Sequence, residues 1–90
     1  MSNYRLINEY EPPRPEDLQR LKDDLGFTGV KMADLAGVAG GNIWRRYTGG
    51  ANPRTMSAQT LFYMAAQLAL SPEELDRVVS KMVEIGARIK

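Results

Sequence analysis

Cysteine and histidine are both absent from this 90-residue chain. Without cysteine there is no disulfide framework and no thiol nucleophile, and without histidine the usual zinc sites and the usual proton shuttle near neutral pH are missing. No apolar stretch approaches the roughly 18 residues of a membrane span, and the first residues lack the apolar core of a signal peptide. We therefore expect a cytoplasmic protein with no metal, no cofactor and no membrane partner.

Motifs for catalysis are also lacking. The sequence contains no phosphate-binding loop and no nucleophile motif. The carboxylate pairs at residues 23–24 and 73–74 fall at the ends of expected helices, where solvation and the helix dipole explain them. We therefore expect no enzymatic activity, no catalytic residue and no small-molecule ligand.

Positive charge is scarce overall but concentrated in one segment. The net charge is only +1, yet residues 31–60 carry four basic residues and one acidic residue, whereas residues 1–30 are net acidic and residues 61–90 are balanced. Such a basic segment is typical of nucleic-acid-binding surfaces. It contains GVAGGNIWRRYTGG, residues 37–50, where polar and aromatic side chains lie between two pairs of glycines. The four cations are Lys31, Arg45, Arg46 and Arg54.

Apolar residues recur every three to four positions, which predicts amphipathic helices, and no segment alternates as a strand does. Proline in a first turn, Ser or Thr at an N-cap and Gly after a last turn mark the boundaries. We expect an arm, residues 1–14, followed by a single domain, residues 15–90. The predicted helices cover residues 15–25, 29–36, about 39 to 47 or 48, 58–69 and 72 to about 88.

The spacing of apolar residues identifies the expected inner face of the third predicted helix. Ile43 and Tyr47 are four residues apart, so we expect both to face the core, with Trp44 beside them and partly exposed. The fourth predicted helix has a clearer apolar stripe, which we expect to lie in the core. Its members are Leu61, Met64, Ala65 and Leu68.

The segment TGVKMADLAGVAGGNIWRRYTGG, residues 28–50, resembles the core of the Cro/C1-type, XRE-like helix-turn-helix family of phage-repressor-like regulators. Thr28 matches the residue that opens the second helix, Met32-Ala33 the pair beneath the next helix, Gly37-Val38 the turn and Ile43 the inward residue. MSAQTLFYMAAQLALSPEEL, residues 56–75, resembles the family's fourth helix and the start of its fifth. The resemblance covers about residues 16–76 and implies an all-α, five-helix, lambda-repressor-like domain.

The resemblance also implies binding to double-stranded DNA, with the third helix in the major groove. Asn42 would read adenine, Arg45 or Arg46 would read guanine or clamp phosphate, and the amides near Thr28 would donate to a phosphate. Lys31 and Arg54 are candidates for further phosphate contacts. The candidate DNA-binding residues are Thr28, Gly29, Lys31, Gly40, Gly41, Asn42, Trp44, Arg45, Arg46 and Arg54.

Two departures from the family pattern bear on that interface. Gly29 stands where the family usually has Gln, and Ala39, Gly40 and Gly41 replace the polar residues that usually begin the recognition helix. Base readout therefore shifts to Asn42, Trp44 and Arg45, or the helix approaches the DNA backbone unusually closely through its glycines.

The last predicted helix carries a seam of apolar residues. Leu75, Val78, Met82, Ile85 and Ile89 are spaced three, four, three and four residues apart, as in a short coiled coil. We expect its first part, residues 75–79, to pack on its own domain and its later part to form a homodimer contact. The expected contact residues are Val79, Met82, Ile85 and Ile89.

Two functions are consistent with these patterns. The first is a sequence-specific transcriptional regulator, a small phage- or mobile-element-type repressor that binds a palindromic operator as a dimer. The alternative is a protein-binding module of the same fold, for example a phage-type inhibitor of a host protein, which would use the surface between Trp44 and Tyr47, because Trp, Tyr and Arg are common in interface hot spots.

Overall fold

The computed structural model describes residues 6–90, so the first five residues of the expected arm lie outside the described part. Residues 6–90 contain five α-helices and no strand, which confirms the all-α class. No helix in this range is long and apolar enough to cross a membrane. The helices are α1 (Pro15–Leu25), α2 (Gly29–Ala36), α3 (Gly41–Thr48), α4 (Ala58–Ala69) and α5 (Pro72–Ile85).

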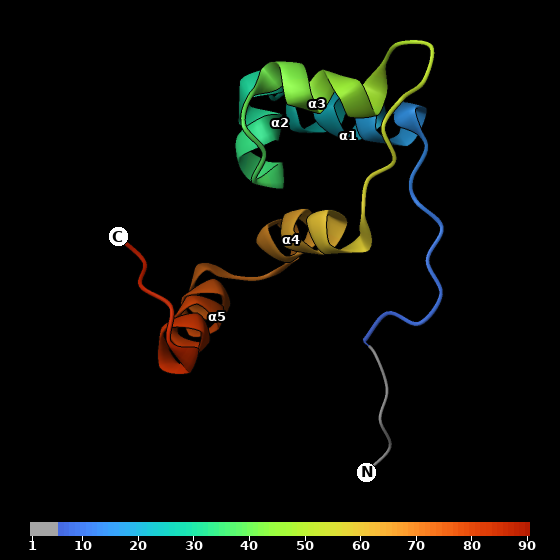
Figure 1. The fold of residues 1–90 in the computed structure, drawn as a ribbon. Helices are drawn as coiled ribbons and strands as arrows, with labels where there is room; N and C mark the ends of the chain where they lie inside the picture. The colour runs from blue at the N-terminus through green and yellow to red at the C-terminus, as the bar shows by residue number, and fades with distance from the viewer. Residues whose placement is uncertain (1–5) are drawn as a thin grey trace.

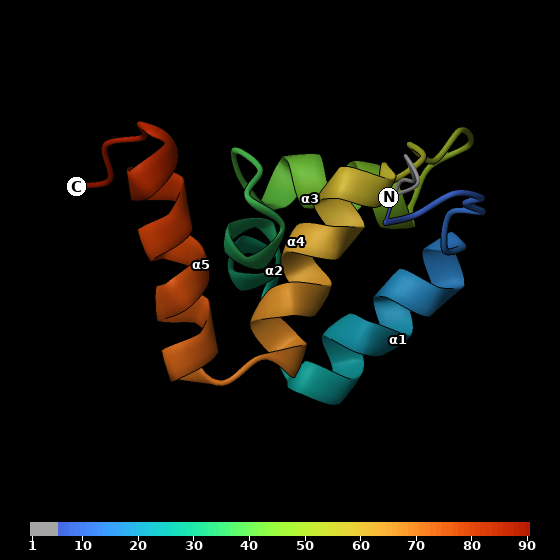
Figure 2. The same cartoon turned by 90° about the horizontal axis from the view of Figure 1, so that it is seen from below.

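Four of the helices form one packed unit, and α5 lies beside it. The close packing is between α2 and α3, between α2 and α4, and between α1 and α3. In Figure 1, α3 lies along the top of the molecule with α1 behind it and α4 below. Figure 1 and Figure 2 both place α5 at the edge of the molecule as a separate rod, and Figure 1 shows it below α4, on the side away from α3.

The helix starts follow the capping residues of the sequence. The hydroxyls of Thr28, Ser57 and Ser71 each accept a hydrogen bond from the backbone N–H three residues later. At α1, the backbone N–H of Arg14 donates to the Asp17 carboxylate over 2.9 Å. This hydrogen bond, with the positive charges of Arg14 and Arg20, lowers the pKa of Asp17 below its ordinary value of 3.8.

Two predicted helix boundaries were wrong. The third helix begins at Gly41 rather than near residue 39, because Gly40 is extended (φ 173°) and its carbonyl accepts the first bonds of the helix. The last helix ends at Ile85 rather than near residue 88. Gly86 has φ 134° there and its N–H donates to the carbonyls of Met82 and Val83, so Ile89 lies beyond the helix.

The core lies where α2, α3 and α4 meet, and it is rich in methionine and small residues. Alanines on α2 let the neighbouring helices approach closely, and long flexible methionines fill the space between them. Gln67 Nε2 on α4 donates to the Leu35 carbonyl on α2 over 2.8 Å, and the Tyr10 hydroxyl donates to the Met56 carbonyl over 2.7 Å, which attaches the arm. Burial raises the pKa of Tyr10. The buried residues are Leu18, Met32, Ala33, Ala36, Trp44, Tyr47, Met56 and Met64.

The structure corrects three expectations about burial. Trp44, rather than Ile43, joins Tyr47 on the inner face of α3, with only 1% of its surface exposed. On α4, Met64 is buried and Leu61 packs against the core, but Leu68 is 45% exposed. At the start of α5, Leu75 is half-buried while Val78 and Val79 remain exposed, so residues 75–79 do not pack on the domain as expected.

Candidate nucleic-acid interface

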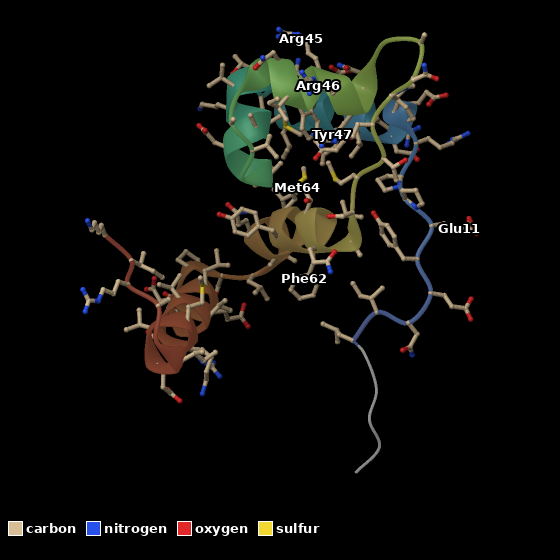
Figure 3. All side chains as sticks on the ribbon, viewed as in Figure 1. Glu11, Arg45, Arg46, Tyr47, Phe62 and Met64 are labelled. Carbon is tan, nitrogen blue, oxygen red and sulfur yellow. The ribbon has the colours of Figure 1, made fainter. Side chains whose placement is uncertain are left out.

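The two faces of α3 differ sharply in chemistry. Asn42, Arg45 and Arg46 are exposed, and their spacing places them on one face, within an arc of about 100° around the helix axis. Trp44 and Tyr47 are buried on the opposite face, where their rings lie 6.0 Å apart at a tilt of 59°. Figure 3 shows Arg45 on the outer side of α3, and Tyr47 on the side of α4 and Met64.

The aromatic pair therefore anchors the helix and does not form a contact surface. With 1% of its surface exposed, Trp44 offers no side-chain atoms to a base or phosphate, so its assignment as a DNA-binding residue was wrong. Neither Trp44 nor Tyr47 offers an aromatic contact to a protein partner, because both side chains are buried, and of residues 44–47 only the two arginines are exposed. Periodicity could not choose between Ile43 and Trp44 as the inward residue, and the larger ring gains more from burial.

The exposed cations of this region form no ion pairs within residues 6–90. In that range, Arg14 and Arg20 form ion pairs with Asp17 of α1. Lys81 forms an ion pair with Glu84 of α5. Lys31 lies over the Phe27 ring, 5.5 Å from its centroid, and keeps its charge at the surface of α2. The guanidinium groups on the outer face of α3 are therefore available to an external anion.

Arg54 lies close to this face although it is eight residues further along the chain. Its backbone N–H donates to the carbonyl of Arg46 over 2.6 Å, so the loop after α3 folds back against the helix. The side chain of Arg54 is exposed. The loop thus brings the backbone of Arg54 against the C-terminal half of α3, and its phosphate contact stays a prediction.

The first turns of α2 and α3 meet at Gly29 and Gly41. A Cβ atom on Gly41 would lie 3.4 Å from the carbonyl carbon of Gly29 and 3.4 Å from the nitrogen of Val30, and a Cβ on Gly29 would lie 3.8 Å from the Cα of Gly41. These are ordinary van der Waals distances, so the two backbones lie in close contact with room for a Cβ atom at either position.

The crossing places two helix N-termini side by side. Thr28 caps the Lys31 amide, and the amides of Gly29 and Val30 have no intrahelical acceptor because they fall in the first turn. A terminal nitrogen of Arg45 lies 3.6 Å from the Cβ position of Gly41, next to these amides. At this point the partial positive charges of the N-termini of α2 and α3 add to the full positive charge of the Arg45 guanidinium.

The junction opens into a pocket of about 440 Å³ between α1, α2 and α3. Its wall includes the cations Lys22 and Arg45 together with polar groups of α1 and α3. An anion with several oxygens, such as a phosphate diester, matches this arrangement of charged and backbone donors. The lining residues are Gln19, Lys22, Gly29, Trp44, Arg45, Thr48 and Gly49.

The chain was compared with known proteins. No family model, no curated protein and no solved structure matches it.

Gly40 leaves room for the side chain of Asn42. A Cβ atom on Gly40 would lie 3.2 Å from Oδ1 of Asn42, closer than ordinary contact. The Asn42 amide thus lies over the N-terminal end of α3, at the end of the helix that enters a groove first when such a helix reads DNA. Of the ten candidate residues, nine lie at least partly exposed on α2, α3 or the loop, and Trp44 is buried.

Proposed function

We propose that this chain is a sequence-specific DNA-binding transcriptional regulator, in which α2 and α3 form a helix-turn-helix of the lambda-repressor-like type. The observation that carries the proposal is the outer face of α3, where Asn42, Arg45 and Arg46 point away from a helix anchored by Trp44 and Tyr47. A rigidly held helix with exposed amide and guanidinium groups has the chemistry that base edges in the major groove require.

In the proposed complex, α3 lies in the major groove. Asn42 pairs with N6 and N7 of an adenine, and Arg45 or Arg46 pairs with O6 and N7 of a guanine. The amides of Gly29 and Val30 face a phosphate, and Lys31 and Arg54 neutralise neighbouring phosphates without reading sequence. A dimer would place two such helices about 34 Å apart on a palindromic operator, and occupancy of that operator would exclude polymerase, as in a small phage- or mobile-element-type repressor.

A selection of random duplex DNA with the purified protein tests this proposal. Recovery of a palindromic motif supports a sequence-specific regulator. Affinity for the selected duplex is expected to fall about 10³- to 10⁵-fold between 50 and 200 mM salt if 6–10 phosphates are contacted. Failure to enrich any motif, or binding that does not respond to salt, would contradict the proposal.

A pair of matched double variants localises the interface. Arg45→Ala with Arg46→Ala is expected to weaken binding to the selected duplex at least about 30-fold, because each good contact of this kind contributes about 1–3 kcal/mol. Circular dichroism should stay unchanged, since both side chains are exposed. Arg88→Ala with Lys90→Ala removes the same charge beyond α5, from two exposed residues, and serves as the control, for which a small loss is expected. Equal losses in the two variants would place the DNA elsewhere.

A further inference from the structure

The exposed apolar residues of this protein are concentrated on and after α5. Half of the large hydrophobic side chains that are exposed in residues 6–90 fall between residues 78 and 89. Within the helix their exposed fractions run from 42% for Val79 to 79% for Ile85. A contiguous apolar surface of this kind on a small protein marks an interaction site. The exposed members are Val78, Val79, Met82, Val83, Ile85 and Ile89.

These residues form one face of the helix, which we call the α5 face. At 100° per residue, its members fall within an arc of about 160°, and the polar residues occupy the rest of the circumference. Within residues 6–90, α5 takes no part in the close helix packing that joins α1 to α4. Figures 1 and 2 show the same separation. The α5 face consists of Leu75, Val78, Val79, Met82, Val83 and Ile85.

The size of the molecular surface agrees with an unburied face. The chain exposes 7143 Å², whereas a compact monomer of its mass, 10.1 kDa, exposes about 5,300 Å². The extended arm accounts for part of the excess and α5 for another part. A standard protein interface buries about 800 Å² from each partner, and the surface of α5 contributes to the excess without accounting for all of it.

Four apolar residues of α5, at positions 75, 78, 79 and 82, are placed symmetrically about the middle of the helix, which lies between Val78 and Val79. When two copies of α5 are laid side by side in opposite directions with full overlap, Leu75 of one copy meets Met82 of the other. Val78 meets Val79 at the centre. An antiparallel pair of this kind has the two-fold symmetry that most homodimers use.

The charges beside the α5 face distinguish the two possible directions. Glu74 and Lys81 lie on the same flank, seven residues apart, next to a pocket of about 500 Å³ that also includes Val78 and Met82. In an antiparallel pair, this flank of one copy faces the same flank of the other copy, which runs in the opposite direction. Glu74 of each copy therefore comes within reach of Lys81 of the other. In a parallel pair, Glu74 would instead meet Asp76, a like charge, and the two helix dipoles would also be aligned unfavourably.

We propose that the α5 face binds the α5 face of a second copy of this chain in an antiparallel helix pair. This pairing supplies the dimer of the proposed function, but it rests on α5 alone, and its test contains no DNA. Failure of the test would therefore leave DNA binding by a monomer intact.

Sedimentation equilibrium of the full chain, from micromolar to millimolar concentration, tests the association. A reversible monomer–dimer equilibrium is expected. Met82→Lys places a charge inside the contact, opposite Leu75 of the other copy, and should weaken the dimer at least 100-fold, whereas Lys81→Gln should weaken it severalfold. Because Met82 is already half exposed in the single chain, the monomeric variant should keep its helical content. A monomer at all concentrations, or a dimer insensitive to Met82→Lys, would overturn the proposal.

Single cysteines test the direction of the pair, and the natural sequence contains none. Val78→Cys lies at the centre of the antiparallel pair and should form a disulfide-linked dimer under mild oxidation. Ile85→Cys lies at one end, so its two copies would be about 20 Å apart, well beyond the roughly 7 Å that a disulfide spans. It should remain monomeric on a denaturing gel. Efficient cross-linking through Ile85→Cys would show a parallel pair and overturn the antiparallel arrangement.

Discussion

Trp44 shows how a single side chain fixes the orientation of the candidate recognition helix. Its indole ring fills the space beneath α3, while its Nε1–H is buried without an acceptor in the described part of the chain. An unpaired buried donor costs about 1–3 kcal/mol, so the ring must contribute more through packing than the N–H loses. The aromatic surface, rather than the polar atom, is what the fold uses at this position.

This balance predicts an order of stability among variants of Trp44. Trp44→Phe keeps an aromatic ring next to Tyr47 and removes the unpaired N–H, so a loss of only about 1 kcal/mol is expected. Trp44→Ala leaves a cavity and should cost about 3–5 kcal/mol. Urea unfolding followed by far-ultraviolet circular dichroism measures both values. If the phenylalanine variant were as unstable as the alanine variant, the N–H would have a partner that the structure does not show.

At the scale of the helix, the capping residues predicted most boundaries. Thr28, Ser57 and Ser71 carry their signal in a side chain, and each starts a helix where the sequence placed it. The start of α3 was misplaced because Gly40 and Gly41 have no side chain to signal a cap. The inward position of Trp44 was missed since it depends on packing against other helices rather than on local spacing.

The outer face of α3 was easier to anticipate than its inner face. Arg45 and Arg46 were expected to be exposed from charge alone, and both are. The role of Gly29 and Gly41 in the helix crossing could not be derived in the same way, because it depends on which two backbones meet. Whether the apolar face of α5 is buried within its own chain could not be predicted either, because an amphipathic pattern shows that a helix has an apolar face but not what covers it.

Gly26 and Gly37 each end a helix, and replacing them with alanine has two possible costs to stability. One cost comes from the left-handed backbone conformation, and the other comes from a close contact of the new Cβ atom. Gly26 and Gly37 have nearly the same conformation, with φ of 69° and 72°. A Cβ on Gly26 would meet nothing within 4 Å, whereas a Cβ on Gly37 would lie 3.0 Å from the Tyr63 ring. The two positions are therefore a matched pair for substitution.

Gly26→Ala should lower the free energy of unfolding by about 1–2 kcal/mol, the cost of a left-handed conformation for a residue with a Cβ. Gly37→Ala should lower it further, because the Tyr63 ring must also shift. Adding Tyr63→Leu to Gly37→Ala should remove the additional loss, since the ring is half exposed and its replacement is tolerated. Chemical denaturation measures all three variants, and equal losses at the two glycines would argue against the Tyr63 contact.

At the scale of the whole molecule, the shape is open for a chain of this length. The radius of gyration is 14.8 Å, compared with about 12 Å for a compact domain of 90 residues. A small core leaves little stability to spare, and a chain of this size gains from any contact that only the folded state can make. The proposed pairing through the α5 face therefore couples the thermal stability of the folded chain to the formation of the dimer.

This coupling predicts that thermal stability depends on protein concentration. Above the dissociation constant of the dimer, each tenfold rise in concentration adds about 1.4 kcal/mol per dimer, or about 0.7 kcal/mol per chain. For a domain of this size, that increment should raise Tm by about 3–5 °C. Met82→Lys should show a lower Tm that does not change with concentration, because a monomer unfolds without a change in the number of particles. Calorimetry on both proteins over a hundredfold range provides the measurement, and a concentration-independent Tm for the natural sequence would mean that α5 remains unpaired when the domain unfolds.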